Sequence, residues 1–122
     1  MTLPHKGNVM KRLSYKIERF NIRLYGNDQK GGRTRWGDKV IVLFSKGKEV
    51  GQAVFARESV KSPEAYCSGD KIFFFAPSSQ YSVVVELLRR PEPVYLNWES
   101  VNDPKEKDDG DAFFSTAPLE GP

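Results

Sequence analysis

Side chains suited to binding an anion are concentrated in one short segment, residues 30–37. Its sequence is Lys-Gly-Gly-Arg-Thr-Arg-Trp-Gly, so three cations and one indole lie among three glycines. Guanidinium groups bind phosphate through paired hydrogen bonds, an indole can stack on a base, and glycine lets the backbone approach a ligand closely. The pattern predicts a nucleic-acid or anion site formed by Lys30, Arg33, Arg35, Trp36 and the nearby Lys39. The alternative is a solvated strand extension in which Trp36 closes the core.

A second candidate site lies near the C-terminus, where the acidic residues of 106–111 precede two phenylalanines. Acids followed by aromatic residues in a polar segment are typical of short motifs that dock on another protein. The predicted docking residues are Asp108, Asp109, Asp111, Phe113 and Phe114. The alternative is an appendage that only increases solubility.

Residue types that carry catalysis are scarce. The chain has one histidine, His5, and one cysteine, Cys67, so it cannot assemble a zinc site of the usual type or a thiol–imidazole pair in its core region. A carboxylate pair is the remaining route to an enzyme, and no spacing singles one out among Glu18, Asp38, Glu49, Glu86 and Glu92. We therefore expect no enzyme, no metal and no cofactor.

Charge is distributed unevenly along the 122 residues. Residues 1–62 carry 14 Lys and Arg against 5 Asp and Glu, whereas residues 63–122 carry 5 against 11. Such asymmetry is typical of a basic surface joined to an acidic tail. A single cysteine, no apolar leader and no apolar run long enough to cross a bilayer indicate a reducing compartment, the cytoplasm, and no membrane partner.

Short apolar runs separated by turn residues predict β-strands rather than helices. The chain offers six such segments: residues 15–25, 40–44, 49–57, 71–76, 80–89 and 94–98. We also expect a bulge near residues 18–19 and one helical turn after Ser62. Residues 40–44 are expected to be a central strand, and Gly51 to mark a bulge or a bend. A proline before residue 94 favours an edge position for the last strand. The pattern predicts an all-β fold, a small antiparallel barrel or sandwich that is OB-like or SH3-like.

The expected organisation has three parts. A basic N-terminal arm covers residues 1–13, the β-domain covers 14–101, and an acidic, disordered tail covers 102–122. The function expected first is a protein-interaction module, such as an adaptor, inhibitor or assembly subunit. Its partner is another protein, and the chain can also form a homo-oligomer through a sheet edge. The second is a binder of single-stranded DNA or RNA that uses residues 30–37, with the tail regulating or recruiting.

Overall fold

The structure is a computed structural model that describes residues 9–25, 37–56, 64–102 and 110–119. Eight strands and one α-helix form in these residues, with bounds as follows: β1 (Val9–Lys16), β2 (Arg19–Leu24), β3 (Gly37–Ser45), β4 (Lys48–Ala56), β5 (Tyr66–Ser68), β6 (Lys71–Pro77), α1 (Tyr81–Leu88), β7 (Tyr95–Asn102) and β8 (Gly110–Ser115). A short 3-10 turn, Ser78–Gln80, precedes α1. The all-β class is confirmed. No described helix is long and apolar enough to cross a membrane.

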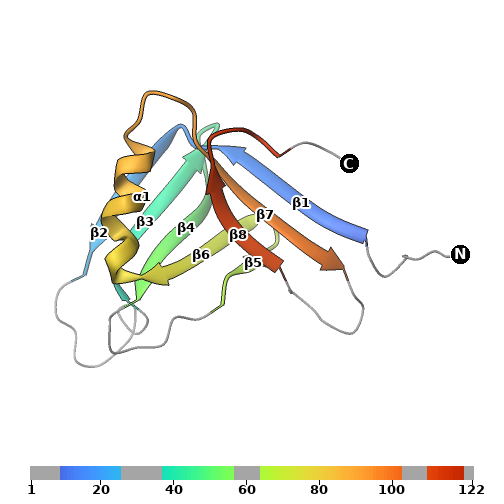
Figure 1. The fold of residues 1–122 in the computed structure, drawn as a ribbon, viewed down its shortest axis with the longest axis horizontal. Helices are drawn as coiled ribbons and strands as arrows, with labels where there is room; N and C mark the ends of the chain where they lie inside the picture. Colours follow the sequence, from blue (N-terminus) through green and yellow to red (C-terminus); the bar gives the residue numbers. More distant parts are fainter. Residues whose placement is uncertain (1–8, 26–36, 57–63, 103–109, 120–122) are drawn as a thin grey trace, which may run out of the picture.

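The strands form two sheets that do not close into a barrel. One sheet has five strands in the order β2-β3-β4-β6-β5, and the other has three in the order β1-β7-β8. The sheets meet where β1 passes into β2 and diverge from that junction, as Figure 1 shows. The predicted all-antiparallel arrangement is wrong at one pair, because β4 and β6 run parallel.

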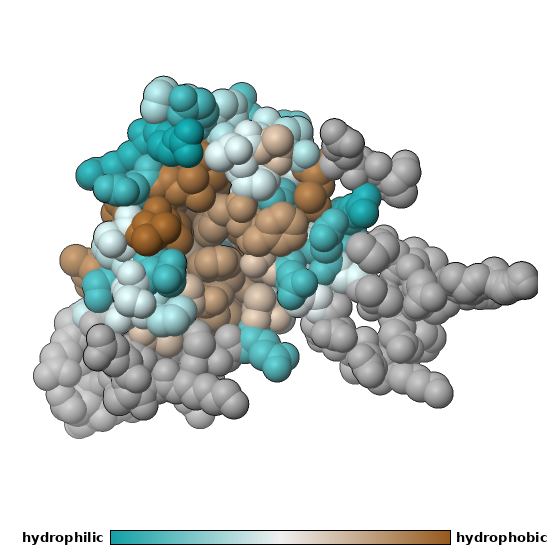
Figure 2. Space-filling view, viewed as in Figure 1, coloured by the Kyte–Doolittle hydropathy of each residue, from teal (hydrophilic) through white to brown (hydrophobic). Residues whose placement is uncertain are grey.

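The core lies between the two sheets and is closed at one end by α1. Its largest fully buried side chains include Phe55 of β4, Ile72 of β6, and Leu96 and Trp98 of β7. Val84 of α1 is 5% exposed and joins the same cluster. Figure 2 shows apolar surface gathered between α1 and β8, on the side where the diverging sheets leave the core uncovered by a strand.

The hairpin of β3 and β4 forms as the sequence predicts. Its turn places Lys46 at φ 55° and Gly47 at φ 81°, a pair of left-handed residues that matches the twist of the two strands. The predicted bulge at Gly51 is confirmed, because the register shifts between Leu43, opposite Gly51, and Phe44, opposite Glu49. A Cβ on Gly51 would meet the carbonyl oxygen of Ile72, so the backbones approach too closely for any other residue.

Residues 81–88 form α1 and not the predicted strand. Almost every residue there is apolar, so the segment fits a period of two and a period of 3.6 equally well. Tyr81, Val84, Val85 and Leu88 fall on one helical face, and all four pack against the core. The second hairpin predicted for residues 71–89 is therefore absent, and β6 pairs with β4 and β5 instead.

Both ends of the described chain belong to the three-stranded sheet. The predicted bulge near Glu18 is a passage between sheets, since β1 and β2 lie on either side of it in different sheets.

The arm predicted for residues 1–13 is wrong from Val9 onward, where β1 begins. The prediction that the tail is disordered is wrong for Gly110–Ser115, because these residues form β8 and pair with β7. Because β1 and β8 flank β7, the last predicted strand is central and not an edge.

Candidate interaction surface

The five-stranded sheet carries stacked aromatic rings on the face that points away from the core. Tyr66 of β5 lies directly opposite Phe73 of β6, and their rings stack at 4.6 Å with an interplanar angle of 13°. Phe75, two residues along β6, lies 6.0 Å from the Tyr66 ring. Side chains two residues apart on a strand share a face, so Phe73 and Phe75 point outward while Phe74 points into the core.

The neighbouring strands continue this outer face with apolar side chains. Register pairs Phe75 with Val54 of β4, and Val54 in turn with Val40 of β3. Phe44 of β3 lies on the same face, under the guanidinium of Arg19, which stands 3.9 Å from the ring centroid. We call Phe44, Val54, Tyr66, Phe73 and Phe75 the aromatic face.

The aromatic face lies on the side of the five-stranded sheet that points away from the core, where Val40 and Val42 of β3 are buried and Tyr66 of β5 is exposed. α1 and the three-stranded sheet both pack on the opposite face, where Val84, Leu96 and Trp98 join the core. Tyr66 is 40% exposed, one of the four large hydrophobic residues exposed in the described chain. An exposed tyrosine ring that stacks on a half-buried phenylalanine is typical of a surface that binds another molecule.

A basic hollow lies at the junction of the two sheets. It has a volume of about 490 Å³, and its lining includes Lys16, Lys46, Lys48 and Tyr95. None of the three lysines forms an ion pair with a described carboxylate. Among the described lining residues Glu18 is the single carboxylate, and it accepts a hydrogen bond from the Lys46 backbone N–H at 2.7 Å. The hollow is therefore suited to an anion.

A second hollow of about 550 Å³ adjoins the first through Lys16 and Glu18. Its charges are mixed, because Arg90 pairs with Glu92 at 3.3 Å. Its walls therefore offer less net positive charge to a ligand than the lysines of the basic hollow do.

Tyr15 is the lining residue of the basic hollow whose titration is clearly perturbed. Partial burial raises the pKa of its phenol, and the nearby charges of Asp70 and Cys67 raise the pKa further. Its hydroxyl donates a hydrogen bond to the Asp70 carbonyl oxygen at 2.7 Å. The neutral phenol thus holds β1 against the β5–β6 turn, which is a structural role.

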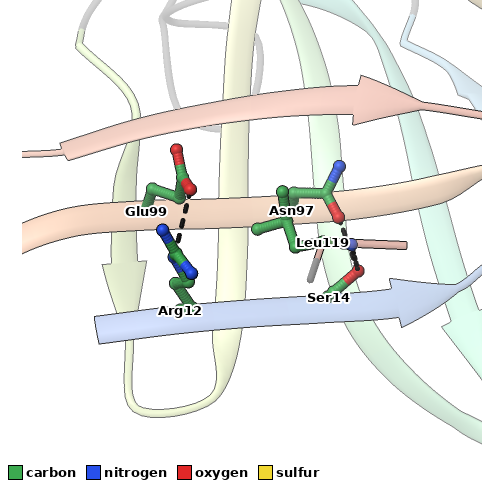
Figure 3. A network of polar contacts seen from close by, with 5 residues as sticks. All are labelled: Arg12, Ser14, Asn97, Glu99 and Leu119. Atoms are coloured by element: carbon green, nitrogen blue, oxygen red, sulfur yellow. Dashed lines mark hydrogen bonds and ion pairs between the residues drawn. The ribbon is translucent and has the colours of Figure 1, made fainter. Parts of the chain in front are cut away.

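A buried polar network covers the outer face of the three-stranded sheet (Figure 3). Ser14 donates to the amide oxygen of Asn97 at 2.6 Å and accepts from the Leu119 backbone N–H at 3.3 Å. The Asn97 amide group also donates to Ser115 at 2.8 Å, and Ser115 donates to the Ala117 carbonyl oxygen. Both polar atoms of the Asn97 amide have partners, so the network joins strands and offers no reactive group.

The basic residues predicted from the sequence are mostly outside the described part of the chain. Lys30, Arg33, Arg35 and Trp36 all fall in residues 26–36. Lys39 is described, in β3, and its ammonium lies 5.7 Å from the ring centroid of Tyr81 at the start of α1. It therefore faces the helix side of the sheet and not the aromatic face.

The residues predicted to dock a partner are divided between the two faces of β8. Asp108 and Asp109 lie outside the described residues. The Phe114 ring packs edge-on against Phe74 at 5.0 Å and joins the core, whereas Phe113 pairs with Asn97 on the opposite face. Asp111 is exposed beside Glu99. The described tail is thus part of the fold, and its two phenylalanines do not form one surface.

Tyr66 and Lys16 were not among the residues predicted from the sequence, whereas Lys46 and Lys48 were expected as possible extensions of the basic patch around residues 30–37. Alternation in residues 71–76 places Phe73 and Phe75 on one face, but Tyr66 lies in a connector without periodicity. Lys16 comes from β1 and the other two lysines from the β3–β4 turn region, so their proximity depends on the sheet junction.

The described residues contain no group of three or more His, Cys, Asp or Glu side chains placed to hold a metal ion. Searches of protein-family models, curated proteins and solved structures find no match to the chain. The assignment of function therefore rests on the geometry of the aromatic face and the basic hollow.

Proposed function

We propose that the chain is a non-enzymatic protein-interaction module that binds its partner on the aromatic face. The observation that carries this proposal is the Tyr66 ring, which is 40% exposed and stacked at 4.6 Å on Phe73. A tyrosine held by stacking loses little conformational freedom on binding, while its ring supplies a large contact area. Such residues dominate the binding energy of protein interfaces.

The surroundings of Tyr66 fit a protein partner. Half-buried Phe73, Phe75 and Val54 provide an apolar centre, and Phe44 lies at the margin under the guanidinium of Arg19. At the same margin as Phe44, Glu49 accepts a hydrogen bond from Gln52 at 3.0 Å and lies 4.0 Å from the Lys71 ammonium. An apolar centre bordered by polar groups is the usual composition of a protein interface.

Selection from a phage-displayed library of random peptides tests the proposal even though the partner is unidentified. Peptides enriched on the wild-type protein are retested on Tyr66→Ser and on Val83→Ser. Both positions carry exposed hydrophobic residues, 40% and 56% exposed, so both variants should fold and lose similar apolar surface. We expect Tyr66→Ser to weaken binding by about tenfold or more, and Val83→Ser to leave it unchanged. Peptides that bind all three proteins equally would contradict the proposal.

A second candidate function, binding of single-stranded nucleic acid, is supported by the basic hollow. Three lysines without ion pairs to described carboxylates adjoin Tyr95 there, and Arg19 lies close by at the junction. Lysines can neutralise phosphates while an aromatic ring stacks on a base. The hollow could act together with the basic residues 30–37, which the sequence predicts as contacts.

Fluorescence titration with a labelled single-stranded oligonucleotide at two salt concentrations tests this second function. Binding through the hollow should weaken steeply with salt, because counterions are released when phosphates are neutralised. Replacing Lys46 and Lys48 by Gln should reduce the affinity and flatten the salt dependence. Lys71→Gln is the matched control, because Lys71 is not among the described lining residues and lies 4.0 Å from the carboxylate of Glu49. Absence of binding at low salt, or equal loss with the control, would exclude a nucleic-acid role for the hollow.

A further inference from the structure

The strand β2 has one paired and one unpaired edge among the described strands. It hydrogen-bonds to β3 on one side and is the end strand of the five-stranded sheet, at the left margin of Figure 1. All its residues are exposed except Phe20, which is half-buried. An unpaired edge presents a row of N–H and C=O groups that can pair with a further strand.

Apolar side chains on β2 distinguish it from the other end strands. Ile22 is 39% exposed and Leu24 is 68% exposed, so β2 holds two of the four exposed large hydrophobic residues of the described chain. Both lie on the same face as Phe20, because they are two and four residues further along the strand. The end strand β5 has only three residues, and no described residue of β1 or β8 belongs to the exposed large hydrophobic set.

We infer that β2 pairs with β2 of a second copy of this chain, antiparallel and with Ile22 opposite Ile22. The two copies would be related by a two-fold axis perpendicular to the sheet, which keeps the two core faces on the same side. Phe20 then lies opposite Leu24 of the second copy. The exposed side chains of Ile22 and Leu24 are therefore covered by apolar residues of the second copy. On the other face, Asn21 lies opposite Arg23 of the second copy, where an amide oxygen can accept a guanidinium hydrogen bond.

Charge excludes the neighbouring registers. Shifting the centre from Ile22 to Asn21 places Arg19 opposite Arg23 of the second copy, twice in each dimer. Shifting it to Arg23 places that residue opposite itself. Like charges directly opposite each other destabilise an antiparallel pair, so the sequence of β2 is complementary to itself in the Ile22-centred register. This self-complementarity identifies the partner as a second copy and not an unrelated strand.

Engineered cysteines test both the dimer and its register, in a Cys67→Ser background that removes the native thiol. Opposite residues of an antiparallel pair have Cα atoms about 5 Å apart, within the range of a disulfide. Ile22→Cys should therefore form a covalent dimer on mild oxidation. Asn21→Cys should not, because its two copies would be offset by two residues, about 8 Å apart. Crosslinking at residue 21 and not at residue 22 would overturn the proposed register.

Sedimentation equilibrium of the full chain measures the oligomeric state directly, at a protein concentration of about 0.1 mM. We expect the mass of a dimer, and about tenfold or more weakening of dimerisation by Leu24→Lys, which is present twice in the interface. Val83→Lys is the matched control on an exposed residue outside β2. A monomer at this concentration, or a dimer insensitive to Leu24→Lys, would overturn the inference. Neither result bears on peptide binding to Tyr66, which lies on the opposite end strand.

Discussion

The Ser14 hydroxyl lies 2.6 Å from the amide oxygen of Asn97, on the face of the three-stranded sheet that points away from the core. Asn97 is nevertheless 0% exposed. A chain of hydrogen bonds runs from the Leu119 N–H through Ser14 and Asn97 to Ser115, and so links β1, β7 and β8 to the segment after β8. The C-terminal residues thus cover a polar centre that would otherwise be open to water.

Replacing Asn97 by Asp should destabilise the protein in a pH-dependent way. Burial raises the pKa of a carboxyl group in the folded state, and the ionised carboxylate introduced there could not donate to Ser115 as the amide does. The penalty is absent below the unfolded pKa, about pH 4, and grows as pH rises through the folded pKa. We expect a loss of about 2–4 kcal/mol at pH 7, mostly recovered near pH 4, in urea unfolding relative to wild type.

Gln80→Glu is the matched control for Asn97→Asp. Gln80 is exposed at the start of α1 and makes no side-chain capping bond, so the same amide-to-acid change introduces no buried charge. Its effect should stay within about 0.5 kcal/mol at both pH values. Equal pH dependence in the two variants would show that Asn97 is not in a buried network.

The strands formed by local hairpin signals were predictable from the sequence, and those that depend on distant partners were not. The turn at Lys46 and Gly47 fixes β3 and β4, because two left-handed residues impose the hairpin locally. In contrast, β8 contains Gly, Asp and Ala and pairs only because β7 supplies an edge. The segment of α1 has two apolar periodicities, and the choice between them is made by the core that Val84 enters.

Phe114→Ala should lower stability and not only partner binding, although the sequence placed Phe114 in a docking motif. The ring packs edge-on against Phe74 at 5.0 Å and contributes to the core. Because the side chain is half-buried, we expect a loss of about 2 kcal/mol in the free energy of unfolding. Asp111→Ala, an exposed change on the same strand, should cost less than about 0.5 kcal/mol. Unchanged stability of Phe114→Ala would mean that its ring is available to a partner.

Gly51→Ala should be among the most destabilising single substitutions in the chain. The added Cβ would meet the Ile72 carbonyl oxygen and lie 2.7 Å from Leu96 Cδ2, where neither strand can move without breaking the parallel pair of β4 and β6. We expect a cost of about 3 kcal/mol or more in thermal or urea unfolding. Gly69→Ala has nothing within 4 Å of its Cβ but a φ of +62°, so it should cost only about 1 kcal/mol. Similar costs for both would contradict the close packing at Gly51.

Tyr15→Phe should make stability less sensitive to alkaline pH. The folded pKa of Tyr15 is raised by burial and by nearby negative charge, so the wild type loses stability as pH rises above the unfolded value of about 10. The variant lacks the ionisable group and should show a shallower decline, with about 1 kcal/mol lost at neutral pH from the missing hydrogen bond to Asp70. The phenolate absorbance titration should lose a component that ionises above pH 10. If the stability of the variant falls with rising pH as steeply as that of the wild type, Tyr15 is not responsible for the alkaline loss.

The candidate surface was predictable only in part. The alternation of Phe73, Phe74 and Phe75 indicates that aromatic rings reach both faces of a sheet, but not which face is covered. That depends on α1 and β7, which both pack on the Phe74 side. Tyr66 is brought to Phe73 by a three-residue strand that has no periodicity of its own.

Site-specific photo-crosslinking in cells that produce the protein tests docking on the aromatic face most directly. A photoreactive phenylalanine analogue is placed at residue 66 in one variant and at residue 83 in another, both at exposed positions. We predict one discrete protein adduct from residue 66 that residue 83 does not give, and its loss when Phe75 is also replaced by Ser. No adduct from residue 66, or the same adduct from both positions, would contradict docking on this face.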